Sequence, residues 1–175
     1  IGSAVAGAGP SWSGLLLVFL FVGLGVIGLL DDGIKIMRQR SLGLHPSGKI
    51  IGQVAVASLF ALGTLIKPNE FGEYPGTLAI SFARPTAMTL GFAGLGLGIA
   101  LYLIWTNLIV TAWSNATNLT DGLDGLAAGV SIFVFGAYTF ITYFQRIQAC
   151  TQLGANQANC YSTRDPLDLA IFCAA

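Results

Sequence analysis

Polar side chains recur at every third position in one segment of the sequence; they are Asn115, Asn118, Asp121 and Asp124. A spacing of three keeps side chains near one face of a helical turn. The amides and carboxylates of such a stripe can hydrogen-bond a sugar or a base, and their oxygens can hold a hard cation. Gly122 would let the backbone approach a ligand closely. The alternative is that Thr120 or Asp124 only caps the next helix, although one cap does not account for a whole polar stripe.

Two adjacent carboxylates, Asp31 and Asp32, close the first apolar stretch of the chain. They repel each other unless a cation lies nearby, and at a helix end they still reach water. This placement is typical of an interfacial site, where a soluble and a lipid substrate can meet. The alternative is a solvated acidic helix end with Lys35 as its ion-pair partner. The segment lacks the third carboxylate of the metal clamp of prenyl-diphosphate enzymes, so it cannot form such a clamp alone.

A basic loop follows the two carboxylates and leads into the second apolar stretch. Pro46 and Ser47 predict a helix start just before Lys49. Free backbone N–H groups at that start, together with the Lys49 ammonium, would form an anion site suited to phosphate. Gln53 lies one turn further along, on the same face. The alternative is that the basic residues only reflect the charge bias of loops at a membrane surface.

The elements that must position these residues are long apolar segments. Four stretches approach the ~20 residues that a helix needs to cross ~30 Å of hydrocarbon; they are residues 14–30, 50–66, 87–113 and 126–144. Residues 167–175 would begin a fifth. Residues 77–83 alternate in polarity after a Pro-Gly turn, which predicts a hairpin. We therefore expect an all-α multi-pass membrane protein with four full transmembrane helices, the start of a fifth and a small extracytoplasmic β-hairpin.

The composition agrees with the bilayer as the solvent. Hydrophobic residues make up 54% of the chain and charged residues 9%, and the mean hydropathy is +0.74. The net charge is zero and the basic residues form no block, so nucleic acid is not an expected partner. The chain begins without Met and ends inside an apolar run. We expect one integral-membrane domain over residues 1–175, incomplete at both ends.

The expected crossings place loops 31–49 and 114–125 on one side of the membrane. Lys and Arg are equally divided between the two sides, so the positive-inside rule does not orient the chain. Cys150 and Cys160 lie in a loop on the opposite side, at a separation that a disulfide could close. Disulfides persist on the oxidising side, which favours a cytoplasmic location for loops 31–49 and 114–125. Two unpaired thiols remain the alternative.

Together these motifs resemble the phospho-N-acetylmuramoyl-pentapeptide transferase family, within the polyprenyl-phosphate N-acetylhexosamine-1-phosphate transferase superfamily. The resemblance rests on residues 28–35, 40–44, 49–53 and 118–127, above all on Asn-Leu-Thr-Asp-Gly-Leu-Asp-Gly at 118–125. It implies a bacterial plasma-membrane enzyme that transfers phospho-N-acetylmuramoyl-pentapeptide from UDP-N-acetylmuramoyl-pentapeptide to undecaprenyl phosphate. UMP would be released, Mg²⁺ would be required, and a homodimer is a further expectation.

The resemblance also implies roles for individual residues. Asp31 and Asp32 would be catalytic, near the attacking lipid phosphate, and Lys49 would bind phosphate. The remaining substrate-binding residues would be Asn118, Asp121, Gly122 and Asp124. Asn118 and Asp121 would also be metal ligands, with a further Asp ligand outside this chain. The family's Pro-Thr-Met-Gly-Gly motif, later metal-binding Asp and His-rich loop are absent from this sequence, so we expect no turnover from the fragment alone.

Two other functions fit parts of this pattern. A sibling transferase that uses UDP-N-acetylglucosamine would share most of the motifs, because the identity of the sugar is not legible in them. An ion-coupled transporter would use Asp and Asn side chains to bind its substrate. Transporter sites usually lie near the middle of the bilayer, whereas the motif carboxylates here lie at helix ends on one side, which favours the transferase.

Overall fold

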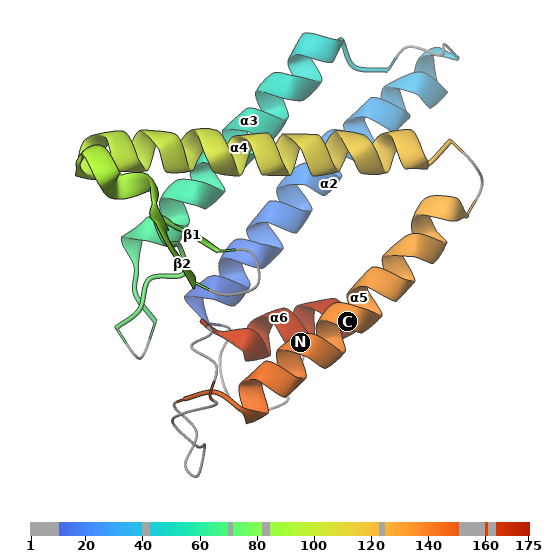
Figure 1. Cartoon of the computed structure of the whole chain (residues 1–175). Coiled ribbons are helices and arrows are strands. Elements are labelled where there is room, and N and C mark those ends of the chain that lie inside the picture. Colours follow the sequence, from blue (N-terminus) through green and yellow to red (C-terminus); the bar gives the residue numbers. More distant parts are fainter. Residues whose placement is uncertain are drawn as a thin grey trace. The chain divides into compact units, whose positions relative to one another are not determined.

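The computed structural model describes residues 11–39, 43–69, 72–81, 85–122, 125–150, 160 and 164–175. The chain forms two compact units, one of residues 18–66 and 76–117, the other of residues 1–17, 67–75 and 118–175. In chain order the elements are α2 (Trp12–Arg38), α3 (Pro46–Ile66), β1 (Ala79–Ser81), β2 (Pro85–Thr89), the 3₁₀ helix η1 (Leu90–Ala93), α4 (Leu95–Thr120), α5 (Leu126–Ile147) and α6 (Pro166–Ala174) (Figure 1).

Four of the described helices, α2 to α5, are long and apolar enough to cross a membrane. The shortest of them, α3, has 21 residues, which at ~1.5 Å per residue matches ~30 Å of hydrocarbon. Large apolar side chains point outward from all four, among them Leu29, Ile51, Ile104 and Phe133. Lipid is the natural partner of such surfaces. The predicted multi-pass helical architecture is confirmed.

Two helices extend beyond their apolar stretches, and both extensions change the setting of site residues. Helix α2 continues to Arg38. Asp31 and Asp32 therefore lie within the helix, whereas the sequence had predicted that they lie at its end. The reason is Lys35, which pairs with both carboxylates across one helical turn and stabilises the continued helix. Helix α4 continues to Thr120. Most of the predicted loop 114–125 is therefore helical.

The predicted hairpin is present, and it displaces the start of the following helix. Strands β1 and β2 are antiparallel, with Ala79 opposite Thr89 and an irregular register before Ser81 pairs with Pro85. Thr89 then accepts a hydrogen bond from the Gly91 N–H (3.1 Å) and caps η1. The sequence placed residues 87–94 in a membrane helix, but they complete the hairpin and η1, and α4 begins at Leu95.

Helices α3 and α4 are joined by three pairs of polar side chains. Along the two helices these are Gln53 with Ser114 (2.9 Å), Ser58 with Asn107 (3.0 Å) and Thr64 with Tyr102 (2.8 Å). The order of partners is reversed on α4, so the helices are antiparallel. Ala57 and Ala61 lie between these pairs and are 0% exposed. Small side chains permit close approach of helices, and the hydrogen bonds add to the packing.

In the other unit, polar contacts join the start of α2, residue 69 and the start of α6. Ser11 and Ser13 donate to the carboxylates of Asp168 and Asp165. The Asn69 amide also donates to Asp165, at 3.2 Å. A disulfide links Cys150 to Cys160, with their Cα atoms 4.9 Å apart, which confirms that these cysteines can pair. The expectation of one integral-membrane domain over residues 1–175 stays a prediction.

Candidate functional site

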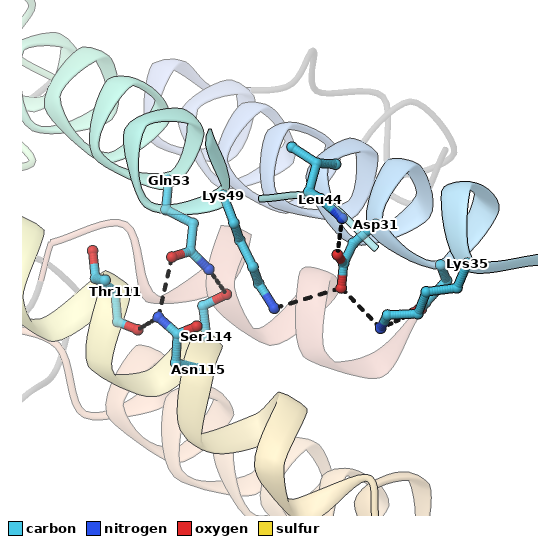
Figure 2. A network of polar contacts seen from close by, with 9 residues as sticks. Asp31, Lys35, Leu44, Lys49, Gln53, Thr111, Ser114 and Asn115 are labelled. Carbon is cyan, nitrogen blue, oxygen red and sulfur yellow. Dashed lines mark hydrogen bonds and ion pairs between the residues drawn. The ribbon is translucent and has the colours of Figure 1, made fainter. Parts of the chain in front are cut away.

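The centre of the site is the carboxylate of Asp31, a residue that is only 6% exposed. One of its oxygens accepts a hydrogen bond from the Leu44 N–H at 2.8 Å. The other lies 2.9 Å from the Lys35 ammonium and 3.8 Å from the Lys49 ammonium (Figure 2). A buried carboxylate is costly unless cations and hydrogen bonds compensate it. Here two lysines and a backbone N–H supply that compensation.

Asp32 has a different environment, although it is the next residue. Its side chain is 66% exposed, against 8% for Asp31, and its carboxylate lies 2.9 Å from the same Lys35 ammonium. Adjacent side chains on a helix diverge by ~100°, so one carboxylate points to solvent while the other is enclosed. The exposure of Asp32 and its pairing with Lys35 agree with the alternative of a solvated, ion-paired carboxylate. The burial of Asp31 contradicts that alternative for Asp31.

The chain after α2 returns to Asp31 through Gly43 and Leu44. A Cβ atom added at Gly43 would lie 2.5 Å from the Asp31 carbonyl oxygen and would overlap its carboxylate. Only glycine therefore lets this segment come close enough for the Leu44 N–H to reach Asp31. Sequence reasoning did not assign a role to Gly43 or Leu44. The available signal was the glycine itself, a few residues before a predicted helix start.

Lys49 lies in the first turn of α3, which begins at Pro46 as predicted. Its side chain is 16% exposed and points toward Asp31 (Figure 2). Its backbone N–H bonds to the His45 carbonyl at 3.2 Å, so this N–H serves the helix and not an anion. The ammonium group, next to a compensated carboxylate, is the part of Lys49 that could bind phosphate.

One turn after Lys49, the Gln53 side chain is 1% exposed and bonded at both ends of its amide. Its Nε2 donates to the Ser114 hydroxyl at 2.9 Å, and its Oε1 accepts from the Asn115 Nδ2 at 3.1 Å (Figure 2). Asn115 also donates to the Thr111 carbonyl at 2.8 Å, which keeps this polar residue within α4. Sequence reasoning placed Gln53 on the Lys49 face but did not find its partners, because they lie on another helix.

The rest of the predicted polar stripe lies at and after the end of α4. Asn118 is exposed in the last turn of α4, and Asp121 and Gly122 are exposed in the turn that follows. Asp124 lies outside the described residues. The N-cap of α5 is Gly125, whose φ of 81° favours glycine. Thr120 is therefore not the N-cap of α5, and the capping alternative for Asp124 falls outside the described residues.

The described part of the chain holds no group of three or more His, Cys, Asp and Glu side chains placed to bind a metal. The Asp31 oxygens are already engaged by lysines and by an N–H. Asn118 and Asp121, by contrast, are exposed oxygen donors one turn apart. Mg²⁺ is often held by one or two carboxylates together with substrate phosphates. Asn118 and Asp121 fit that partial type of site.

Membrane-length helices with an Asp–Lys cluster between them define a multi-pass membrane protein with an ionisable site. Ionisable residues in such helices usually serve function. The sequence matches the family described as glycosyl transferase family 4 over residues 14–163. The chain belongs to this family.

Relatives of this chain carry the name phospho-N-acetylmuramoyl-pentapeptide-transferase, among them the following three. The protein of Beutenbergia cavernae is 55% identical over 166 residues, which cover 95% of this chain and 46% of that protein. The proteins of Pseudarthrobacter chlorophenolicus and Renibacterium salmoninarum are 53% and 52% identical, over 95% of this chain and 45% and 46% of their own lengths. The chain thus spans about half the length of the relatives it matches.

Proposed function

We propose that the protein containing this chain transfers phospho-N-acetylmuramoyl-pentapeptide from its UDP carrier to undecaprenyl phosphate in the bacterial plasma membrane. An oxygen of the lipid phosphate attacks the sugar-bearing phosphorus of the donor. A new diphosphate bond forms, the bond to the UMP oxygen breaks, and UMP leaves. Relatives that carry the name of this transferase and are about half identical to the chain support the reaction. The observation that carries the proposal is the buried Asp31 carboxylate between Lys35 and Lys49.

Asp31 and Asp32 are the proposed catalytic pair, and their surroundings suggest unequal roles. Phosphoryl transfer asks a protein mostly for positioning and electrostatic stabilisation. Asp31 fixes the ammonium groups of two lysines, so its loss would disturb the charges that meet the phosphates. Asp32 is more exposed and shares one lysine. We therefore assign the larger contribution to Asp31, a difference that the sequence did not reveal.

Lys49 is the proposed ligand of the donor diphosphate. An ammonium group beside negative phosphates stabilises charge that shifts during the transfer. At 3.8 Å from Asp31, it is held more loosely than Lys35 and can turn to a phosphate without leaving its helix. Asp31 would then keep Lys35 and the Leu44 N–H as partners.

Asn118, Asp121, Gly122 and Asp124 are the proposed nucleotide-binding residues. Their amides, carboxylates and exposed backbone suit the hydrogen-bonding edges of a base and a ribose. Asn118 and Asp121 would also contribute oxygens to Mg²⁺, whose chemistry would be to neutralise the diphosphate charge. A further Asp ligand is expected from the part of the protein outside this chain.

The disulfide supports the proposed orientation. Cys150 follows the end of α5, and a disulfide persists on the oxidising side of the membrane. One crossing by each of α5, α4 and α3 then puts the turn after α4 and the loop between α2 and α3 in the cytoplasm, where the UDP donor is made available. The homodimer stays a prediction.

The test is an assay of the full-length protein for UMP release. We expect release when UDP-N-acetylmuramoyl-pentapeptide and undecaprenyl phosphate are both present, and none when the lipid is omitted. Release with UDP-N-acetylglucosamine in place of the muramoyl donor would instead identify the sibling transferase. Ion-driven uptake of a solute without UMP release would identify a transporter.

A further inference from the structure

We infer that Gln53 is a positioning residue: its hydrogen bonds to α4 fix the turn of α3 that carries Lys49. The inference rests on the proposed function, because it assigns Gln53 an effect on phosphate binding that passes through Lys49. Gln53 itself is enclosed and contacts the side chains of Ser114 and Asn115.

Gln53 places a polar amide at a fully buried position, where an apolar side chain could fill the same space. It is the largest fully buried side chain among the described residues. An amide without partners in a membrane interior costs several kcal/mol, and Met or Leu would fill the same volume without that requirement. Both polar ends of the Gln53 amide are satisfied from α4, so the residue joins two helices at one fixed register.

Two hydrogen bonds from one side chain constrain α3 more strongly than one does. Ser114 and Asn115 are adjacent on α4, and they bind opposite ends of the same amide. This arrangement resists rotation of α3 about its axis and sliding along α4. Lys49 projects from the preceding turn of α3, on the same face as Gln53. The direction of its long side chain therefore depends on the rotation that Gln53 fixes.

A second amide contact between the same helices supplies the matched control. Asn107 donates to the Ser58 hydroxyl at 3.0 Å, as Gln53 does to Ser114. Ser58 lies nine residues after Lys49, about 13 Å along the helix at ~1.5 Å per residue. If hydrogen bonds between α3 and α4 only stabilise the fold, loss of either contact should change kcat/KM for the UDP donor by the same factor. If Gln53 positions Lys49, only its loss should affect phosphate binding.

The experiment compares Gln53→Met and Asn107→Leu in the full-length protein, with Lys49→Met as a third variant. A misplacement of about 1 Å can cost up to ~100-fold in rate. We expect kcat/KM for the UDP donor to fall at least about tenfold in Gln53→Met and to change less than about twofold in Asn107→Leu. The double variant Gln53→Met/Lys49→Met should be no slower than Lys49→Met, because Gln53 acts through Lys49.

A second readout needs no turnover. The acylation rate of the Lys49 amine, measured by mass spectrometry of modified peptides, should change in Gln53→Met and stay unchanged in Asn107→Leu. The inference would be overturned if Gln53→Met and Asn107→Leu had the same kcat/KM and the same acylation rate. It would also be overturned if the fold-loss in kcat/KM of Gln53→Met/Lys49→Met equalled the product of the losses in the two single variants. Absence of turnover in the unmodified protein would refute the proposed function alone, since the acylation comparison would still decide the role of Gln53.

Discussion

Asp31 and Asp32 show how neighbouring residues of one type can have different chemistry. Asp31 lies under the Gly43–Leu44 segment and faces two lysines, whereas Asp32 faces outward and contacts one. The angular separation of adjacent helical residues is enough to cause the difference. An isosteric amide would keep the hydrogen bond from Leu44 but remove the charge that holds Lys35 and Lys49.

We predict that Asp31→Asn reduces turnover by about 10²- to 10³-fold, the range typical for loss of a group that stabilises charge in the transition state. Asp32→Asn should reduce turnover by less than about tenfold, because the Asp32 carboxylate is exposed and Lys35 would still be paired with Asp31. The measurement is kcat of the full-length variants, with binding of a uridine-containing inhibitor as the control for folding. That binding should persist in both. Unmodified turnover in both variants would mean that the pair has no catalytic role.

Gly43 offers a second test at the scale of single residues. Gly43→Ala should push the Leu44 N–H away from Asp31, because the added methyl would overlap the Asp31 carboxylate and carbonyl. We expect kcat to fall by about tenfold or more. Gly33→Ala is the control on the neighbouring helix, since nothing lies within 4 Å of its added Cβ. Equal rates in the two variants would show that the close approach of Gly43 does not matter.

At the scale of elements, helices α2 and α3 pack through a glycine. A Cβ at Gly23 would lie 2.8 Å from a methyl carbon of Val56. Gly23→Ala should therefore lower the free energy of unfolding by about 1 to 3 kcal/mol, the usual cost of overpacking. The thermal midpoint of the detergent-solubilised full-length protein measures this change.

The matched control for this packing is Gly25→Ala, where nothing lies within 4 Å of the added Cβ. It should leave the midpoint unchanged or raise it slightly, because Ala favours the helix. Adding Val56→Ala to Gly23→Ala should restore part of the loss. A midpoint that falls equally in Gly23→Ala and Gly25→Ala would contradict the proposed contact.

The sequence predicted the elements better than the contacts between them. Apolar length was enough to find α2 to α5, and alternation with a Pro-Gly turn was enough to find the hairpin. The continuation of α2 past residue 30 was not predicted, because the charges of Asp31 and Lys35 interrupt the apolar pattern while their pairing stabilises the helix. The partners of Gln53 could not be predicted, since no periodicity in one segment shows which helix will face it.

At the scale of the whole molecule, the proposed orientation in the membrane rests on the disulfide. Cys150 and Cys160 are bonded, so we predict that they react with a membrane-impermeant thiol reagent on intact cells only after reduction. The control is the double variant Cys150→Ser/Cys160→Ser, in which this labelling should disappear although Cys173 remains. Protection of both cysteines after reduction would reverse the topology and place the Asp31 loop outside.

The chain accounts for about half of each relative's length, so its function is best measured inside a complete enzyme. The most direct measurement is UMP release by a chimera in which residues 14–163 replace the corresponding segment of the Beutenbergia cavernae relative. We predict lipid-dependent release of UMP from UDP-N-acetylmuramoyl-pentapeptide, and loss of that release in the same chimera with Asp31→Asn. A chimera that binds a uridine-containing inhibitor but releases no UMP, or one whose release survives Asp31→Asn, would contradict this prediction.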